Sequence, residues 1–60
     1  MIFLDDLKKA KITKSRIIIT YKSGVTLSCI IDFLTLTYAV MDKPKGKVVF
    51  FDTIEAVDFD

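Results

Sequence analysis

The chain opens with apolar residues spaced as on one side of a helix. They recur at intervals of about one helical turn and are Ile2, Phe3, Leu7 and Ala10. Acidic residues come before basic ones along this segment, which suits the helix dipole. The pattern predicts a helix over residues 2–11, which is too short to be stable unless it packs on other elements.

Beyond residue 15 the apolar positions alternate with polar ones, as in β-strands. Ile, Val and Thr supply 19 of the 60 residues, and most of them lie in this part of the chain. We expect turns at Ser23-Gly24 and at Lys43-Pro44-Lys45-Gly46. The predicted strands are residues 16–22, 25–33, 34–42, 47–51 and 54–59.

The alternation changes phase near residues 33–35. Before this point one face carries Val25, Leu27, Cys29, Ile31 and Phe33; after it, one face carries Leu34, Leu36, Tyr38 and Val40. A sharp bend or bulge without a true loop accounts for the shift. Because a flat five-stranded sheet would leave an apolar face in water, we expect a mainly β fold curled into a small barrel, with a single domain over residues 1–60.

Hydrophobic residues make up 52% of the chain, more than a small domain readily hides. A chain of this length buries only about 60% of the surface that its unfolded form exposes. Residues 47–51 stand out because they are apolar on both faces. They are either a strand buried on both sides or an edge strand that pairs with a neighbouring subunit, and the composition favours pairing.

The inventory of reactive side chains argues against an enzyme. The chain has no His and one Cys, which excludes a structural zinc site and a disulfide framework. No set of residues has the spacing of a catalytic, metal or cofactor site, so we expect none of these. No apolar run exceeds the four residues of Val48–Phe51, which is too short to span a bilayer. A net charge of +1 gives no general attraction to DNA or membranes, and we expect a cytoplasmic protein.

Charge is unevenly distributed along the chain. Residues 8–22 carry six basic side chains and no acid, whereas residues 48–60 carry four acids and no base. The basic segment is either a solvated face or a rim that contacts phosphates, and the sequence leaves both open.

The order of these elements and several short motifs resemble the Hfq family of bacterial Sm-like RNA chaperones. The resemblance runs from Phe3 to about Val57 and rests on Phe3-Leu4 before Leu7-Lys8-Lys9, on residues 19–27, and on Ile54 with Val57. It implies an Sm-like or SH3-like five-stranded bent-sheet barrel with a short N-terminal helix. It also implies a homo-oligomeric ring of six subunits, in which the fourth strand of one pairs with the fifth of the next. The implied interface residues are Val48, Val49, Phe50, Ile54 and Val57.

The same resemblance assigns three surfaces that in the family bind RNA. Lys8, Lys9 and Lys11 match its basic rim. The distal face would carry Thr20, Gly24, Thr26 and Ser28, where short hydroxyls replace the family's Tyr, Lys and Gln. Phe51 and Asp52 would face the pore in place of its Lys and His, and the acid repels phosphate. The implied function is an RNA-binding ring that binds weakly, mainly through its rim.

An alternative hypothesis gives the protein no role in binding RNA. The missing stacking aromatics and the acidic segment 52–60 are also compatible with a small Sm-like or SH3-like protein-interaction module of a phage or a regulatory system. If Asp52 lines a pore, six converging carboxylates would attract cations or basic peptides instead of RNA.

Overall fold

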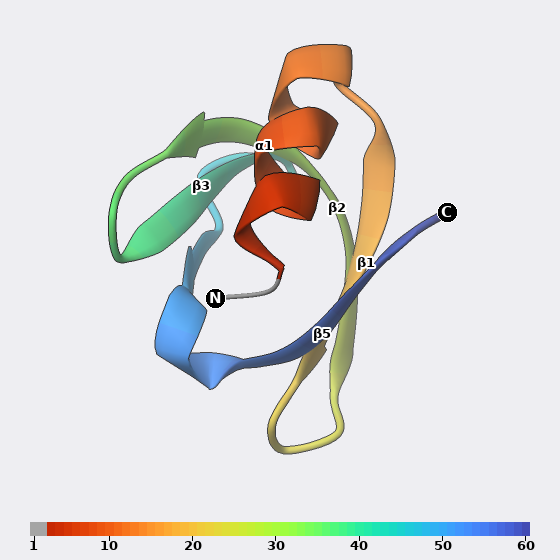
Figure 1. The fold of residues 1–60 in the computed structure, drawn as a ribbon, viewed down its shortest axis with the longest axis vertical. Helices are drawn as coiled ribbons and strands as arrows, with labels where there is room; N and C mark the ends of the chain where they lie inside the picture. Colours follow the sequence, from red (N-terminus) through yellow and green to blue (C-terminus); the bar gives the residue numbers. More distant parts are fainter. Residues whose placement is uncertain (1–2) are drawn as a thin grey trace.

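The computed structural model describes residues 3–60 and shows a mainly β fold with one short N-terminal helix, as predicted (Figure 1). The elements are α1 (Leu4–Thr13), β1 (Arg16–Tyr21), β2 (Thr26–Leu34), β3 (Tyr38–Lys43), β4 (Val48–Phe50), the 3-10 turn η1 (Phe51–Thr53) and β5 (Ile54–Phe59). The strands curl into a partial barrel, and α1 lies across its open side, where it contacts β2 and β5 (Figure 1).

Helix α1 is displaced along the chain relative to its predicted bounds. It begins at Leu4 and continues to Thr13, whereas the prediction ended at residue 11; residue 2 lies outside the described residues. The helix stops because Lys14 takes a left-handed conformation with φ of 53°. The N–H groups of Lys14 and Ser15 then bond to the carbonyls of Lys11 and Ala10. A lysine rarely takes this role, so the sequence gives little sign of the stop.

The five strands form one antiparallel sheet in the order β4-β3-β2-β1-β5. The two predicted turns are confirmed, and each depends on a glycine with positive φ: Gly24 at 92° between β1 and β2, and Gly46 at 79° between β3 and β4. Strands β4 and β5 end the sheet, so each has one backbone edge without a strand partner in the described residues.

Strand β2 bends where its pairing with β3 changes register on both sides of Ile31. Ile31 faces the core, but Phe33 faces outward opposite Val40 and is 52% exposed. The expected bulge is therefore present. The prediction that Phe33 shares the inner face was wrong, since the irregular pairing reverses the side on which the strand presents its residues.

A real turn separates β2 from β3, contrary to the expectation of a bend without a loop. Residues 35–37 leave the sheet, so the predicted strand 34–42 begins only at Tyr38. The Thr35 hydroxyl holds this turn: it donates to the Tyr38 carbonyl over 3.1 Å and accepts from the N–H groups of Thr37 and Tyr38 over 3.2 and 3.0 Å. Threonine hydroxyls commonly satisfy the backbone of such turns.

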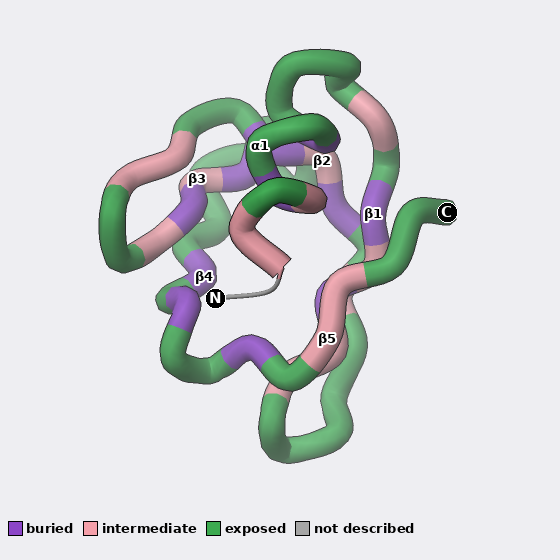
Figure 2. Tube along the Cα trace, viewed as in Figure 1, coloured by how far each residue is buried: buried purple, intermediate pink, exposed green. Residues whose placement is uncertain are grey.

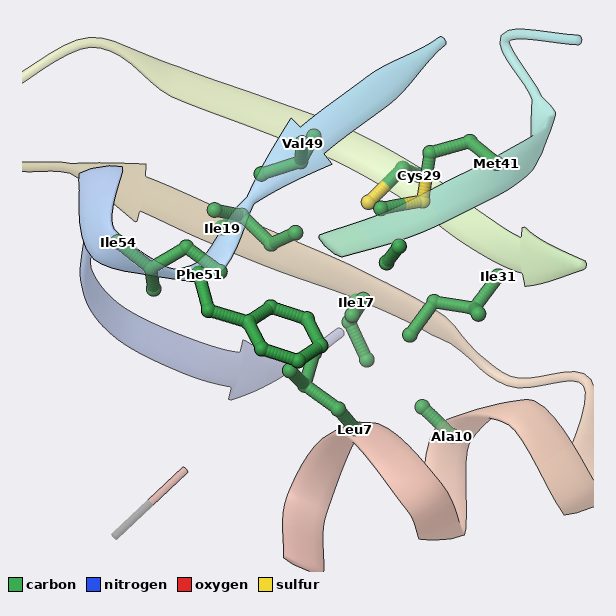
Figure 3. Close-up of a cluster of buried hydrophobic side chains, with 11 residues drawn as sticks. Leu7, Ala10, Ile17, Ile19, Cys29, Ile31, Met41, Val49, Phe51 and Ile54 are labelled. Atoms are coloured by element: carbon green, nitrogen blue, oxygen red, sulfur yellow. The ribbon is translucent and has the colours of Figure 1, made fainter. Parts of the chain in front are cut away.

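The core lies between α1 and the concave face of the sheet (Figure 3). Leu7 and Ala10 point from the helix toward the strands. The buried set is Leu7, Ala10, Ile17, Ile19, Cys29, Ile31, Ala39, Met41, Val49, Phe51 and Ile54. In β3 the inward residues are Ala39 and Met41, whereas Tyr38 and Val40, the predicted apolar face, lie on the outer side of the sheet.

Two predicted interface residues belong to this core. Val49 and Ile54 are 2% and 3% exposed within a single chain, so their side chains pack inside the subunit and only their backbone groups are left to contact a neighbour. Strand β4 is also shorter than the predicted 47–51, because the chain enters η1 at Phe51. Its other two residues, Val48 and Phe50, face outward and remain exposed.

Figure 2 shows buried positions alternating with intermediate and exposed ones along the strands. Large exposed apolar residues lie on the outer side of β2 and β4, among them Phe33, Val48 and Phe50. This outer patch comprises Phe33, Tyr38, Val40, Val48 and Phe50. The rings of Tyr38 and Phe50 are in contact, with centroids 5.6 Å apart. The patch adjoins the free edge of β4, which places exposed apolar side chains beside unpaired backbone groups.

We predict that Val49→Asp unfolds the chain rather than only dissociating an oligomer. A carboxylate in the core, without a partner, costs more than about 3 kcal/mol. The matched control is Val48→Asp, since Val48 neighbours it on β4 but is 42% exposed. Circular dichroism during urea unfolding should show the native signal lost for Val49→Asp and largely kept for Val48→Asp. Equal midpoints would contradict the assignment of these two faces.

Candidate nucleic-acid interface

The three predicted rim lysines are exposed on α1 but do not form one cluster. The Lys9 Nζ lies 5.6 Å from the centroid of the Phe59 ring, so Lys9 extends toward β5. Lys8 and Lys11, which are one turn apart, line a groove together. The rim therefore consists of a pair beside the groove and a single lysine placed over an aromatic ring.

The groove lies between α1 and the turn after β2 and has a volume of about 480 Å³. We call it the α1 groove; its lining residues are Leu4, Lys8, Lys11, Ile12, Leu34, Thr35 and Leu36. Leu36 is 94% exposed and Ile12 is 79% exposed. Sequence reasoning missed both, because it placed Leu36 on the apolar face of a strand and did not consider Ile12. Helical spacing alone places Ile12 one turn after Lys8, away from the buried Leu7 and Ala10.

The predicted distal-face residues do lie together. Thr20 of β1 pairs with Thr26 of β2, and Ser28 follows Thr26 on the same outer face, while Gly24 lies in the connecting turn. The Arg16 guanidinium donates to Ser28 Oγ over 3.2 Å, which adds one cation that the prediction had not included here. This surface offers hydroxyls and a guanidinium.

The predicted pore pair is divided between core and surface. Phe51 is 3% exposed and packs edge-on against Phe3, with ring centroids 6.4 Å apart, so the prediction that it faces a pore was wrong. The tight turn of η1 after β4 directs it inward. Asp52 remains exposed and borders a second hollow of about 250 Å³ with Leu36, Thr37, Phe50 and Phe51.

Two side chains among residues 3–60 have a raised pKa, Cys29 and Tyr21. Cys29 is fully buried, and burial raises the pKa of its thiol to about 11, against a smaller opposing effect of the Arg16 cation. Burial also raises the pKa of Tyr21. Within residues 3–60, no three His, Cys, Asp or Glu side chains are placed to hold a metal ion. No helix in this range has the length and apolar character needed to cross a membrane.

Comparison with solved structures connects this architecture to a known protein. A 1.55 Å crystal structure of the pleiotropic translational regulator Hfq matches with a TM-score of 0.83, covering 93% of this chain and 86% of that chain. The chain has the Sm-like fold of Hfq. The two sequences are only 10% identical, so the likeness to Hfq concerns the fold. No protein-family model and no curated protein matches the chain.

We predict that Cys29 does not react with a thiol reagent such as an aromatic disulfide at pH 8 unless the chain unfolds. A buried, protonated thiol is a poor nucleophile. Because the folded state keeps this proton to a higher pH than the unfolded state, stability should fall as pH rises from about 9 to about 11. Urea midpoints measured across this range should fall less in Cys29→Ala. Fast labelling of the native protein would contradict the burial.

Proposed function

We propose that the chain forms a homo-oligomeric ring that binds single-stranded RNA weakly, through rim lysines and backbone phosphates. The observation that carries this proposal is the fold likeness to Hfq, a translational regulator, over nearly the whole chain. The role is non-enzymatic, cytoplasmic and independent of metal or cofactor, and it involves neither DNA nor membranes. As the resemblance implies, the ring has six subunits.

Assembly is supported by the two free edges of the sheet. Strands β4 and β5 lie at its opposite ends, so the edge of β4 in one subunit can continue into β5 of the next. Val48 and Phe50 are exposed beside the first edge, and Val57 is half-buried on β5. Covering these side chains would add apolar burial to the backbone hydrogen bonds.

RNA binding is supported by the exposed cations of α1. Lys8, Lys9 and Lys11 would be repeated around a ring, which strengthens the field that attracts phosphates. The distal face has no aromatic platform among Thr20, Thr26 and Ser28, and base stacking is worth about 1–3 kcal/mol per base where it occurs. Binding should therefore be weak, dependent on salt and tolerant of sequence.

We predict that Lys8→Glu combined with Lys9→Glu abolishes RNA binding and leaves assembly intact. Filter binding with single-stranded RNAs at ~50 mM salt, where phosphate contacts are strongest, measures this. The matched control is Lys43→Glu with Lys45→Glu, which reverses the same charge at the exposed end of β3 and in the turn after it. The control should retain most of the affinity.

One outcome would contradict the RNA role, and another would contradict only the assignment of RNA binding to the rim. The unmodified protein could fail to retain any RNA at ~50 mM salt. Alternatively, both double variants could lose affinity equally, which would mean that net charge matters and the rim does not. If the first double variant also lost its native mass, the lysines would be structural.

A second function is favoured by a specific observation: two of the rim lysines, Lys8 and Lys11, border an apolar groove. A small protein-interaction module would use such a groove without binding RNA. Absence of RNA binding in the filter assay, together with normal folding and assembly, would favour this second function.

A further inference from the structure

The α1 groove presents aliphatic side chains from both of its walls. Leu4 and Ile12 belong to α1, whereas Leu34 and Leu36 belong to the end of β2 and the turn after it. Ile12 and Leu36 are among the most exposed large apolar residues of the described chain. A contiguous apolar surface with solvent-exposed side chains on both of its walls is typical of a binding site.

The polar groups of the groove are unsuited to reading a nucleobase. The only hydroxyl among its described lining residues belongs to Thr35, and this group already donates to the Tyr38 carbonyl and accepts from two backbone N–H groups. None of the lining residues that the structure describes is aromatic, so they give a base no ring on which to stack. The groove is therefore better suited to aliphatic or aromatic side chains than to RNA bases.

Charge defines the rest of the groove's chemistry. Among residues 3–60, Lys8 and Lys11 are its only charged lining residues, both are exposed, and no acid of this range lines it. Their Cβ atoms, three positions apart on one helix, lie about 5–6 Å from each other. An occupant that places carboxylates at this border complements both cations, whereas a basic or neutral occupant leaves them without partners.

We propose that the α1 groove docks a segment of a partner protein in which apolar side chains are flanked by acidic residues. Its volume of about 480 Å³ lies within the range of about 300–1,000 Å³ that is usual for ligand pockets. This site is additional to the proposed RNA rim. It shares Lys8 and Lys11 with that rim but does not use Lys9, whose ammonium lies over Phe59.

The probe for this site is the peptide Glu-Glu-Leu-Leu-Glu-Glu-Leu-Phe-Glu-Glu, titrated into the full isotope-labelled chain. Backbone amide shifts should change at Leu4, Ile12, Leu34 and Leu36. Two further peptides separate the contributions: one replaces every Leu and Phe by Ser, and the other replaces every Glu by Gln. Both should bind at least about tenfold more weakly, since each removes either apolar burial or charge pairing.

Variants of the chain test the same contacts from the protein side. Leu36→Ser should weaken the first peptide about tenfold, and because Leu36 is exposed the change should leave the fold intact. The matched control is Val25→Ser, an exposed apolar residue beside the β1–β2 turn, which should have no effect. Lys8→Ser with Lys11→Ser should weaken binding several-fold, whereas Lys9→Ser should not.

Three results would overturn the proposal. Equal binding of the Ser-substituted peptide would mean that charge alone is recognised. Shifts confined to other surfaces, such as the outer patch, would place the occupant elsewhere. An RNA oligonucleotide whose affinity depends on Leu36 would identify nucleic acid as the occupant. Loss of RNA binding without loss of peptide binding would count against the proposed function and leave this site standing.

Discussion

The change of register around Ile31 in β2 determines which residues form the core and which remain on the surface. It directs Phe33 outward, and the turn that follows brings Ala39 and Met41 inward. Strand β4 takes its alternation from β3, so the same shift decides that Val49 is buried while Val48 and Phe50 are exposed. The outer patch and the position of Leu36 beside α1 both follow from this bend.

The sequence predicted the elements better than it predicted the faces of the strands after the bend. Periodicity and the two glycine turns were sufficient for the order of helix and strands, because these signals are local. Which side of the sheet each later residue occupies depends on how many residues the bend contains. That number is set by the pairing of β2 with β3 and cannot be read from local sequence. Phe51 illustrates the limit: its match to a pore residue of the resembled family suggested a pore, yet the tight η1 turn directs it into the core.

The candidate site could likewise be predicted only in part from the sequence. Exposure of the lysines on α1 could be predicted from helical spacing, but their separation into a groove pair and a single Lys9 depends on β5 and the turn at residues 35–37. The excess of apolar residues noted in the composition is divided between the outer patch, beside a free strand edge, and the α1 groove, beside two cations. These surroundings differ, and so do the partners proposed for them: another copy of the chain for the first and an acidic segment for the second.

The central claim is that the free edges of β4 and β5 join neighbouring copies into a closed ring. Native mass spectrometry or light scattering of the full chain in solution tests it most directly. We expect a single species with a mass about six times the 6.8 kDa of one chain. A monodisperse monomer, stable at concentrations well above those used for binding, would contradict assembly and leave only the fold.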